Sequence, residues 1–327
     1  MSKSSIEKAF ESFNNKTCLI VGDSMVDAYL WGSVSRISPE APVPVVSISK
    51  RENRLGGAAN VALNIIALGA TPILCGVIGN DSKGETFKDL LKESKLSEEG
   101  IITDNKRKTT SKTRVISAAH HMLRVDEETT ENISLVTEDR LLAKIKTLID
   151  EKKPDVIILE DYNKGVLTEK VIISIIALAK EKKIPVSVDP KKSNFFVYQG
   201  ATMFKPNLKE FIEGTKIEWS EFNLEALQKQ AKKFKSELNI DKILITLSEK
   251  GALICGEKEI HVPAEVRNIA DVSGAGDTVI AVASLALAAG LSDEEIVKIS
   301  NLAGGLVCEK VGVVPVNKEQ LLQEAIK

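Results

Sequence analysis

The sequence is poor in the residues from which most metal and redox centres are built. It contains only 3 histidines and 4 cysteines among 327 residues, and no two cysteines have the CxxC spacing. A structural zinc site or a dithiol redox motif is therefore not expected. Cysteines that are scattered through apolar stretches are typical of reduced, buried thiols in a cytoplasmic protein.

Long apolar runs and an excess of one charge are also lacking. The longest stretch of low polarity, 278–291, is shorter than the roughly 20 residues that cross a bilayer as a helix. The first ten residues are polar and show no signal-peptide core. The formal net charge is −2, without the basic excess that nucleic-acid binding usually needs. We expect a cytoplasmic protein with neither a membrane nor a nucleic-acid partner.

Short β-branched runs alternate with amphipathic helical stretches along most of the chain. Strands are predicted at 17–21, 73–77, 155–159, 185–188, 202–204 and 242–246, and helices at 58–68, 85–93, 169–180, 224–238, 277–289, 293–309 and 318–326. Near-continuous apolar strands that are linked by helices indicate a mostly parallel sheet covered on both faces. The pattern predicts an α/β fold that forms one domain over residues 1–327.

Two segments interrupt this alternation. Residues 29–50 contain three prolines around an extended run, and residues from about 113 to 125 predict two short strands around the His120–His121 pair. Neither segment fits a strand–helix unit. We expect them to form a small β-sheet that acts as a lid and keeps water away from a reacting group.

The clearest chemical motif is the heptapeptide DVSGAGD at 271–277, which runs directly into a predicted helix. The amides of Gly274, Ala275 and Gly276 would lie at the helix N-terminus, where unpaired N–H groups and the helix dipole favour an anion. Phosphoryl transfer needs such neutralisation of developing charge. Asp277 would then accept a hydroxyl proton. Alternatively, Asp277 only caps the helix and the glycines form a tight turn.

Two shorter motifs offer groups for a polyhydroxylated ligand. Gly56 and Gly57 permit close approach of a ligand, and the amide of Asn60 can both donate and accept hydrogen bonds. A plain junction between a loop and a helix would look the same. Asp27 follows the first strand closely and could hold two neighbouring hydroxyls, whereas Asp23 fits a turn residue better.

Asn207 and Glu210 share one face of a predicted helix start and could hold Mg²⁺ through water. The alternative is an ordinary helix start with an acidic residue in its first turn. Thr246 and Gly251 flank the turn after a strand, which is a plausible but unspecific place for nucleotide contacts.

Taken together and in this order, the motifs resemble the ribokinase-like (PfkB) family of carbohydrate kinases. Residues 56–62, with Gly69 and Gly79, fit the first signature of that family, and residues 271–277 fit the second. Val282 departs from the second signature, which usually has Ala or Gly there. The resemblance implies a ribokinase-like fold that uses ATP and Mg²⁺.

The resemblance also implies roles for single residues. The catalytic base would be Asp277 and the anion hole would be formed by Gly274, Ala275 and Gly276, while sugar hydroxyls would be bound by Asp27, Gly56, Gly57 and Asn60. Mg²⁺ and phosphate would lie near Asn207 and Glu210, and the nucleotide would contact Thr246, Gly251 and Asn301. Some members bind a monovalent cation such as K⁺ at the place of Asp271 and Ser273.

Within the family, the stretches 35–45, 55–62, 161–165, 189–191 and 206–210 resemble the D-glycero-D-manno-heptose 7-phosphate kinases. The resemblance implies phosphorylation of the anomeric hydroxyl to give the 1,7-bisphosphate, on the route to ADP-heptose for the lipopolysaccharide core. Candidate cations for the phosphate of the substrate are Arg36, Arg124, Lys164 and Lys191. Glu160 could contact the sugar or pair with a cation.

Other activities stay open at this point. A ribokinase, a fructokinase or a nucleoside kinase would share the signatures, and a catalytically silent sugar- or nucleotide-binding protein could keep the fold. The sequence holds no HxGH motif, so we expect a stand-alone kinase without a nucleotidyltransferase domain. Because family members often pair through their lids, we also expect a homodimer.

Overall fold

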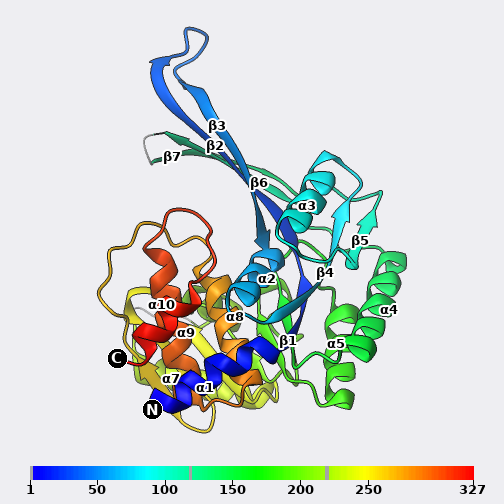
Figure 1. Cartoon of the computed structure of the whole chain (residues 1–327), viewed down its shortest axis with the longest axis vertical. Helices are drawn as coiled ribbons and strands as arrows, with labels where there is room; N and C mark the ends of the chain where they lie inside the picture. Colours follow the sequence, from blue (N-terminus) through cyan, green and yellow to red (C-terminus); the bar gives the residue numbers. More distant parts are fainter. Residues whose placement is uncertain (1–2, 118–119, 218–220) are drawn as a thin grey trace.

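The computed structural model describes residues 3–117, 120–217 and 221–327. Its centre is a nine-stranded sheet (Figure 1). In spatial order the strands are β13 (Glu259–Val262), β12 (Ala252–Cys255), β11 (Lys242–Thr246), β10 (Met203–Phe204), β9 (Val186–Asp189), β8 (Val156–Glu160), β1 (Thr17–Gly22), β4 (Thr71–Gly79) and β5 (Gly100–Asp104). The pairs β11–β12 and β12–β13 are antiparallel and all the others are parallel. The expected mostly parallel sheet is confirmed.

Helices cover both faces of this sheet. One face packs against α1 (Lys3–Ser12), α2 (Ala58–Ala67), α3 (Ser82–Glu93), α8 (Ala275–Ala288), α9 (Asp293–Cys308) and α10 (Lys318–Ala325), and the other against α4 (Leu135–Lys152), α5 (Glu169–Lys182), α6 (Leu208–Thr215) and α7 (Leu224–Glu237). In β1, Cys18 and Ile20 belong to the first core, whereas Leu19 and Val21 belong to the second. Since successive side chains point to opposite faces, a doubly covered strand must be apolar throughout.

A second sheet of four strands projects from this body (Figure 1). Its order is β3 (Pro44–Gly57), β2 (Ser24–Ile37), β6 (Ser111–Ser117) and β7 (His120–Glu127), and we call it the lid sheet. The small second sheet that the sequence predicts is thus confirmed, although β2 begins earlier than residue 29 and β3 continues to Gly57. Residues 118–119 of the second predicted segment lie outside the described residues, and His120 and His121 lie in β7, not in a turn.

Among the described helices, none has the length and the apolar character needed to cross a membrane. All four cysteines are buried and unpaired, as expected.

The chain places polar residues at the carboxyl ends of its central strands. Glu160 and Asp189 are aligned in register at the ends of β8 and β9, and Glu160 is aligned on its other side with Gly22 at the end of β1. β1 is also the switch point of the sheet, because it pairs with β4 on one side and β8 on the other. Open α/β sheets bind their ligands outside such a point.

Candidate active site

Asp277 lies in the first turn of α8 and is only 5% exposed. The preceding Gly274 has φ = 80°, a left-handed conformation that suits glycine and turns the chain into the helix. Asn60 Nδ2 donates to Oδ2 of Asp277 and Tyr162 Oη donates to Oδ1, each at 2.7 Å. Burial raises the pKa of Asp277 to about 6, against these two hydrogen bonds, which lower it.

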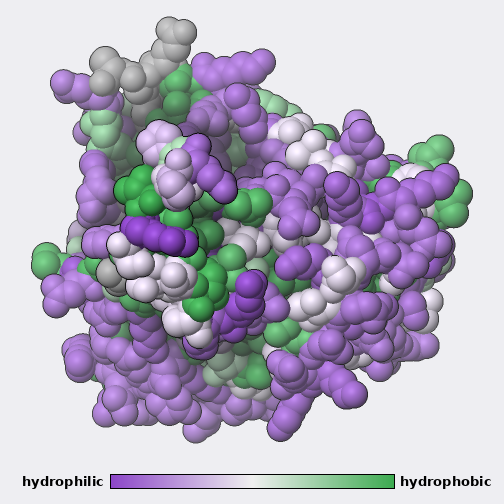
Figure 2. Space-filling model, turned by 90° about the horizontal axis from the view of Figure 1, so that it is seen from above, coloured by the Kyte–Doolittle hydropathy of each residue, from purple (hydrophilic) through white to green (hydrophobic). Residues whose placement is uncertain are grey.

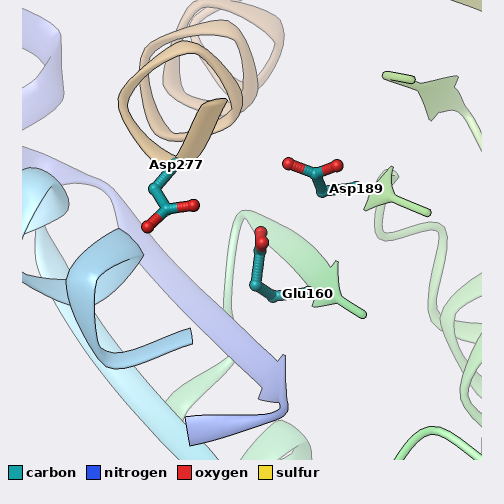
Figure 3. A group of neighbouring side chains, drawn as sticks. All are labelled: Glu160, Asp189 and Asp277. Atoms are coloured by element: carbon teal, nitrogen blue, oxygen red, sulfur yellow. The ribbon is translucent and has the colours of Figure 1, made fainter. Parts of the chain in front are cut away.

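Two further carboxylates face Asp277 (Figure 3). Oxygen atoms of Glu160, Asp189 and Asp277 lie within 4.8 Å of one another, and all three residues are buried. Burial first, and then the charges of Asp189 and Asp277, raise the pKa of Glu160 well above its usual range. Oε2 of Glu160 has no hydrogen-bond partner in the described part of the chain. The raised pKa favours the protonated form of Glu160, in which the unpartnered oxygen could donate a hydrogen bond to a ligand.

A buried cation lies beside this acidic group. Lys205 follows β10 directly, is 2% exposed, and places Nζ 2.7 Å from Oδ2 of Asp189. A Cβ atom added to Gly276 would lie 3.6 Å from this Nζ. The ammonium group is therefore next to residues 274–276, which we call the glycine loop. Burial lowers the pKa of Lys205, whereas neighbouring carboxylates, Asp189 foremost, raise it, and the net shift is upward. The lysine and the N-terminus of α8 together suit an anion.

Asn207 and Glu210 form a capping box at the start of α6. Asn207 Oδ1 accepts the Glu210 N–H, and Glu210 Oε2 accepts the Asn207 N–H, each at 2.8 Å. The remaining oxygen, Oε1, pairs with Lys191. Because both oxygens of Glu210 are engaged, Mg²⁺ would reach this pair through water, which fits the tendency of Mg²⁺ to keep several waters.

The residues predicted to bind sugar hydroxyls are joined to the lid sheet. Asp27 of β2 is buried and forms a salt bridge with Arg114 of β6. A Cβ atom on Gly56 would approach Oδ2 of Asp27 to 2.3 Å, so this position leaves no space for a side chain unless Asp27 moves. Asn60 keeps its Oδ1 atom without a partner in the described part of the chain, and this buried acceptor is open to a ligand.

The other candidate cations make separate contacts. Lys164 Nζ lies 2.8 Å from Oε1 of Glu128. Arg124 pairs with Asp126 within β7, and Arg36 is exposed near the end of β2. Among the described contacts, those of Lys191 reach other residues of the site, namely Glu210 and the ring of Tyr162.

The candidate nucleotide and cation residues lie further along the chain. Thr246 forms an isolated bridge with Asn207, Gly251 turns the chain at φ = 92°, and Asn301 Nδ2 donates to the Pro263 carbonyl. The carboxylate of Asp271 accepts the N–H groups of Ser273 and Gly312, each at 2.9 Å. Asp271 thereby ties the glycine loop to the segment after α9.

Sequence reasoning assigned no role to Tyr162, Asp189, Lys205 or Arg114. Asp189 and Lys205 could have been found from their place at strand ends, beside residues that were assigned. Arg114 carried no signal, because its partner Asp27 is 87 residues away.

Comparison with known proteins identifies the family to which this geometry belongs. The model of the pfkB family of carbohydrate kinases matches residues 15–320. The chain belongs to this family. It is therefore a carbohydrate kinase.

Among curated PfkB relatives, the bifunctional protein HldE of Sulfurimonas denitrificans is 41% identical over 96% of this chain, and the HldE of Citrifermentans bemidjiense is 39% identical over 99%. The matched part spans 65% and 66% of those relatives. Two solved structures share the fold. Phosphofructokinase-2 from Escherichia coli in complex with potassium has a TM-score of 0.77 and 18% sequence identity, and the match covers 95% of this chain and 99% of the other. Arabidopsis thaliana ribokinase complexed with ribose and ATP has a TM-score of 0.71 and 16% identity, and the match covers 95% of this chain and 99% of the other.

Proposed function

We propose that this kinase transfers the γ-phosphoryl group of ATP to the anomeric hydroxyl of D-glycero-D-manno-heptose 7-phosphate. The product would be the 1,7-bisphosphate, a precursor of ADP-heptose for the lipopolysaccharide core. The observation that carries the chemistry is a buried Asp277 at the N-terminus of α8, beside the glycine loop and Lys205. The similarity to HldE proteins and the closer sequence motifs favour a heptose phosphate as the acceptor.

In the proposed step, the carboxylate of Asp277 takes the proton of the acceptor hydroxyl. The acceptor oxygen forms a bond to the γ-phosphorus, and the bond from that phosphorus to the β,γ-bridging oxygen breaks, which leaves ADP. Each oxygen of Asp277 accepts one described hydrogen bond and has a second lone pair free for this proton. General-base catalysis of this kind contributes roughly 10²–10⁴-fold.

The charge that develops on the transferred group would be met by fixed donors. These are the ammonium group of Lys205 and the amides of Gly274, Ala275 and Gly276. Of these, the Ala275 N–H donates to the Val272 carbonyl oxygen at 3.3 Å and would have to leave it. Mg²⁺, when bound with ATP, neutralises phosphate charge, and Asn207 and Glu210 would hold it through water. Asp271 and Ser273 remain the candidates for a monovalent cation, and Thr246, Gly251 and Asn301 for the nucleotide.

For the sugar, we propose contacts with Asp27, Asn60 and the backbone at Gly56 and Gly57. Asn60 Oδ1 and Glu160 Oε2 are buried, have no partner among the described residues, and would gain one from a sugar hydroxyl. Lys191 and Lys164 are the proposed cations for phosphate groups. To bind a phosphate, Lys164 would have to break its salt bridge with Glu128.

The remaining expectations belong to the same proposal. We propose that residues 1–327 act as one kinase domain in the cytoplasm, where ATP is available. The lid sheet would cover the acceptor and would join two chains into a homodimer. A related protein, phosphofructokinase-2 from Escherichia coli, has been solved in a tetrameric inhibited form.

The acceptor is tested by ADP release with MgATP and five compounds: D-glycero-D-manno-heptose 7-phosphate, sedoheptulose 7-phosphate, fructose 6-phosphate, ribose and adenosine. We expect strong turnover with the first compound alone. Turnover with ribose, adenosine or fructose 6-phosphate instead would discard the heptose assignment but keep the kinase chemistry. Silence with all five would favour a sugar- or nucleotide-binding protein.

The base is tested in the same assay by Asp277→Asn. We expect this variant to keep its ATP affinity and to lose at least about 10²-fold in kcat. Asp150→Asn, which changes an exposed aspartate of α4, serves as the control and should leave kcat unchanged. Near-normal turnover by Asp277→Asn would refute the assignment.

A further inference from the structure

Tyr162 contacts the proposed base directly. It follows β8 by two residues, and its hydroxyl donates to Oδ1 of Asp277 at 2.7 Å. We propose that Tyr162 is a positioning residue that fixes the orientation of the Asp277 carboxylate toward the acceptor hydroxyl. This inference rests on the proposed function, because it assigns a partner to the base of that reaction.

The carboxylate of Asp277 is held at both of its oxygens. Asn60 Nδ2 donates to Oδ2 from α2, and Tyr162 Oη donates to Oδ1 from the loop after β8. Two donors on different elements prevent rotation of the carboxylate about its Cβ–Cγ bond. Loss of either donor would leave the other oxygen bonded but would release this rotation. Proton abstraction depends on alignment, so a released carboxylate reacts more slowly.

The backbone that carries Tyr162 is itself fixed. The carboxylate of Asp23, which is buried, accepts the N–H groups of Tyr162, Lys164 and Val166 at 2.8, 2.9 and 3.1 Å. One buried side chain therefore holds three amides of a single loop. Such a loop presents the tyrosine hydroxyl in one place, as a positioning role requires.

The ring of Tyr162 faces the phosphate side of the site. Lys191 Nζ lies 5.3 Å from the ring centroid, within the range of a cation–π interaction. Lys191 also pairs with Glu210, the residue proposed to lie near Mg²⁺. Tyr162 therefore stands between the group that accepts the proton and the residues that would hold the phosphates, and its ring and its hydroxyl serve different neighbours.

The chain contains a matched control for this tyrosine. Tyr198 is buried, and its hydroxyl donates to Oδ2 of Asp161, also at 2.7 Å. That pair is likewise a tyrosine hydroxyl bonded to an aspartate at the same distance, but it makes no described contact with Asp277. Tyr162→Phe and Tyr198→Phe each remove one hydroxyl and keep the ring, so their comparison separates an effect on the base from a general loss of packing.

The experiment measures kcat and KM of Tyr162→Phe, Tyr198→Phe, Asp277→Asn and the double variant Tyr162→Phe/Asp277→Asn, with the sugar that the wild type phosphorylates. We expect Tyr162→Phe to lower kcat roughly tenfold or more, because a hydrogen bond to a charged group is lost, with KM for the sugar little changed. Tyr198→Phe should keep the wild-type kcat. In the Asp277→Asn background, Tyr162→Phe should cost less than about twofold, since the residue acts through Asp277.

Three results would overturn the inference: a wild-type kcat for Tyr162→Phe, an equal loss for Tyr198→Phe, or the same loss from Tyr162→Phe in both backgrounds. Circular dichroism and thermal unfolding of each variant identify a loss that comes from misfolding. The inference and the proposed function fail differently. A wild-type kcat for Asp277→Asn refutes the base itself, whereas an inactive Asp277→Asn with a normal Tyr162→Phe refutes only the positioning role.

Discussion

Asp277 must be ionised to accept a proton, yet it lies where ionisation is costly. Burial raises its pKa to about 6, and the hydrogen bonds from Asn60 and Tyr162 keep it from rising further. The nearby charges oppose each other, because Asp189 raises the pKa and Lys205 lowers it. The residue is thus a stronger base than an exposed aspartate and is still largely ionised at neutral pH.

This balance predicts the acid limb of the pH–rate profile. The ionised form of Asp277 is the active one, so kcat should be constant above pH 7 and should fall about tenfold per pH unit below pH 6. Removal of the Asn60 hydrogen bond by Asn60→Ala takes away an interaction that lowers the pKa, and the limb should move to higher pH. The measurement is kcat against pH for both proteins.

The phosphate of the substrate also titrates near pH 6, and Asn60→Ala separates the two origins of the limb. A limb that belongs to the substrate would stay in place in the variant. The prediction therefore fails if the midpoint is the same in both proteins, whatever its value.

Some residues of the candidate site could be proposed from the sequence for a clear reason. Asp277 and Asn60 each stand in a compact glycine motif at a helix start, so a few neighbouring residues suffice to find them. The hydrogen bonds that give them their environment join residues far apart, such as Tyr162 and Asp277, which are 115 positions apart. Such a contact depends on the order of strands in the sheet, which no local pattern of residues reveals.

Among the elements, the junction of β3 with α2 places Asn60 beside Asp277. Gly57 ends β3 and caps α2 with φ = 60° and ψ = −135°, a region that is open almost only to glycine. A Cβ atom at this position would approach the Asp23 carbonyl oxygen to 2.3 Å. Glycine is thus required here both by the backbone angles and by the nearby carbonyl oxygen of Asp23, the residue whose side chain holds the Tyr162 loop.

Gly57→Ala should therefore lower both stability and activity. The strained backbone costs roughly 1–3 kcal/mol, and the clash adds to it, so we expect the melting temperature to fall by roughly 4 °C or more and kcat to fall with it. Gly290→Ala is the control: Gly290 has φ = 74° after α8, but a Cβ atom there meets nothing within 4 Å. This variant should lose about 2 °C and keep its kcat. Equal losses in the two variants would contradict the role of the contact.

At this scale the sequence was most informative where strands are covered on both faces. The predicted strand at 242–246 coincides with β11, and the predicted helix at 58–68 coincides with α2 and its capping residue. The long helix α4 was not predicted. β3 was predicted too short, because its end, 51–57, is polar and glycine-rich; these residues are extended through pairing with β2, a tertiary effect.

For the molecule as a whole, the lid sheet has two different faces. Asp27, Tyr29 and Arg114 share the face that carries the proposed sugar contacts. The register places Leu30, Val115 and Leu123 in one row on the opposite face, because successive strand residues alternate. Leu123 is 59% exposed and Val125, on the same face, is 45% exposed. Figure 2 looks down on this region and shows apolar side chains gathered around the projecting strands, within a mostly hydrophilic surface.

An exposed apolar face on a projecting sheet favours association, and the proposed homodimer would bury it against a second copy of the chain. We therefore expect light scattering to give twice the 35.5 kDa of one chain for the wild type. Leu123→Asp/Val125→Asp places charges in the proposed interface and should give the mass of one chain. Leu135→Asp/Val136→Asp makes the same replacements at the start of α4, outside the lid sheet, where both side chains are 70% exposed, and should leave the mass unchanged. A wild-type mass equal to one chain excludes the dimer, and a dimer that survives Leu123→Asp/Val125→Asp places the interface elsewhere.

If the pairing also keeps the lid sheet in position over the sugar, the monomeric variant should show a raised KM for the sugar with little change in the KM for ATP, because Asp27 lies on a lid strand whereas Lys205 and the α8 N-terminus do not.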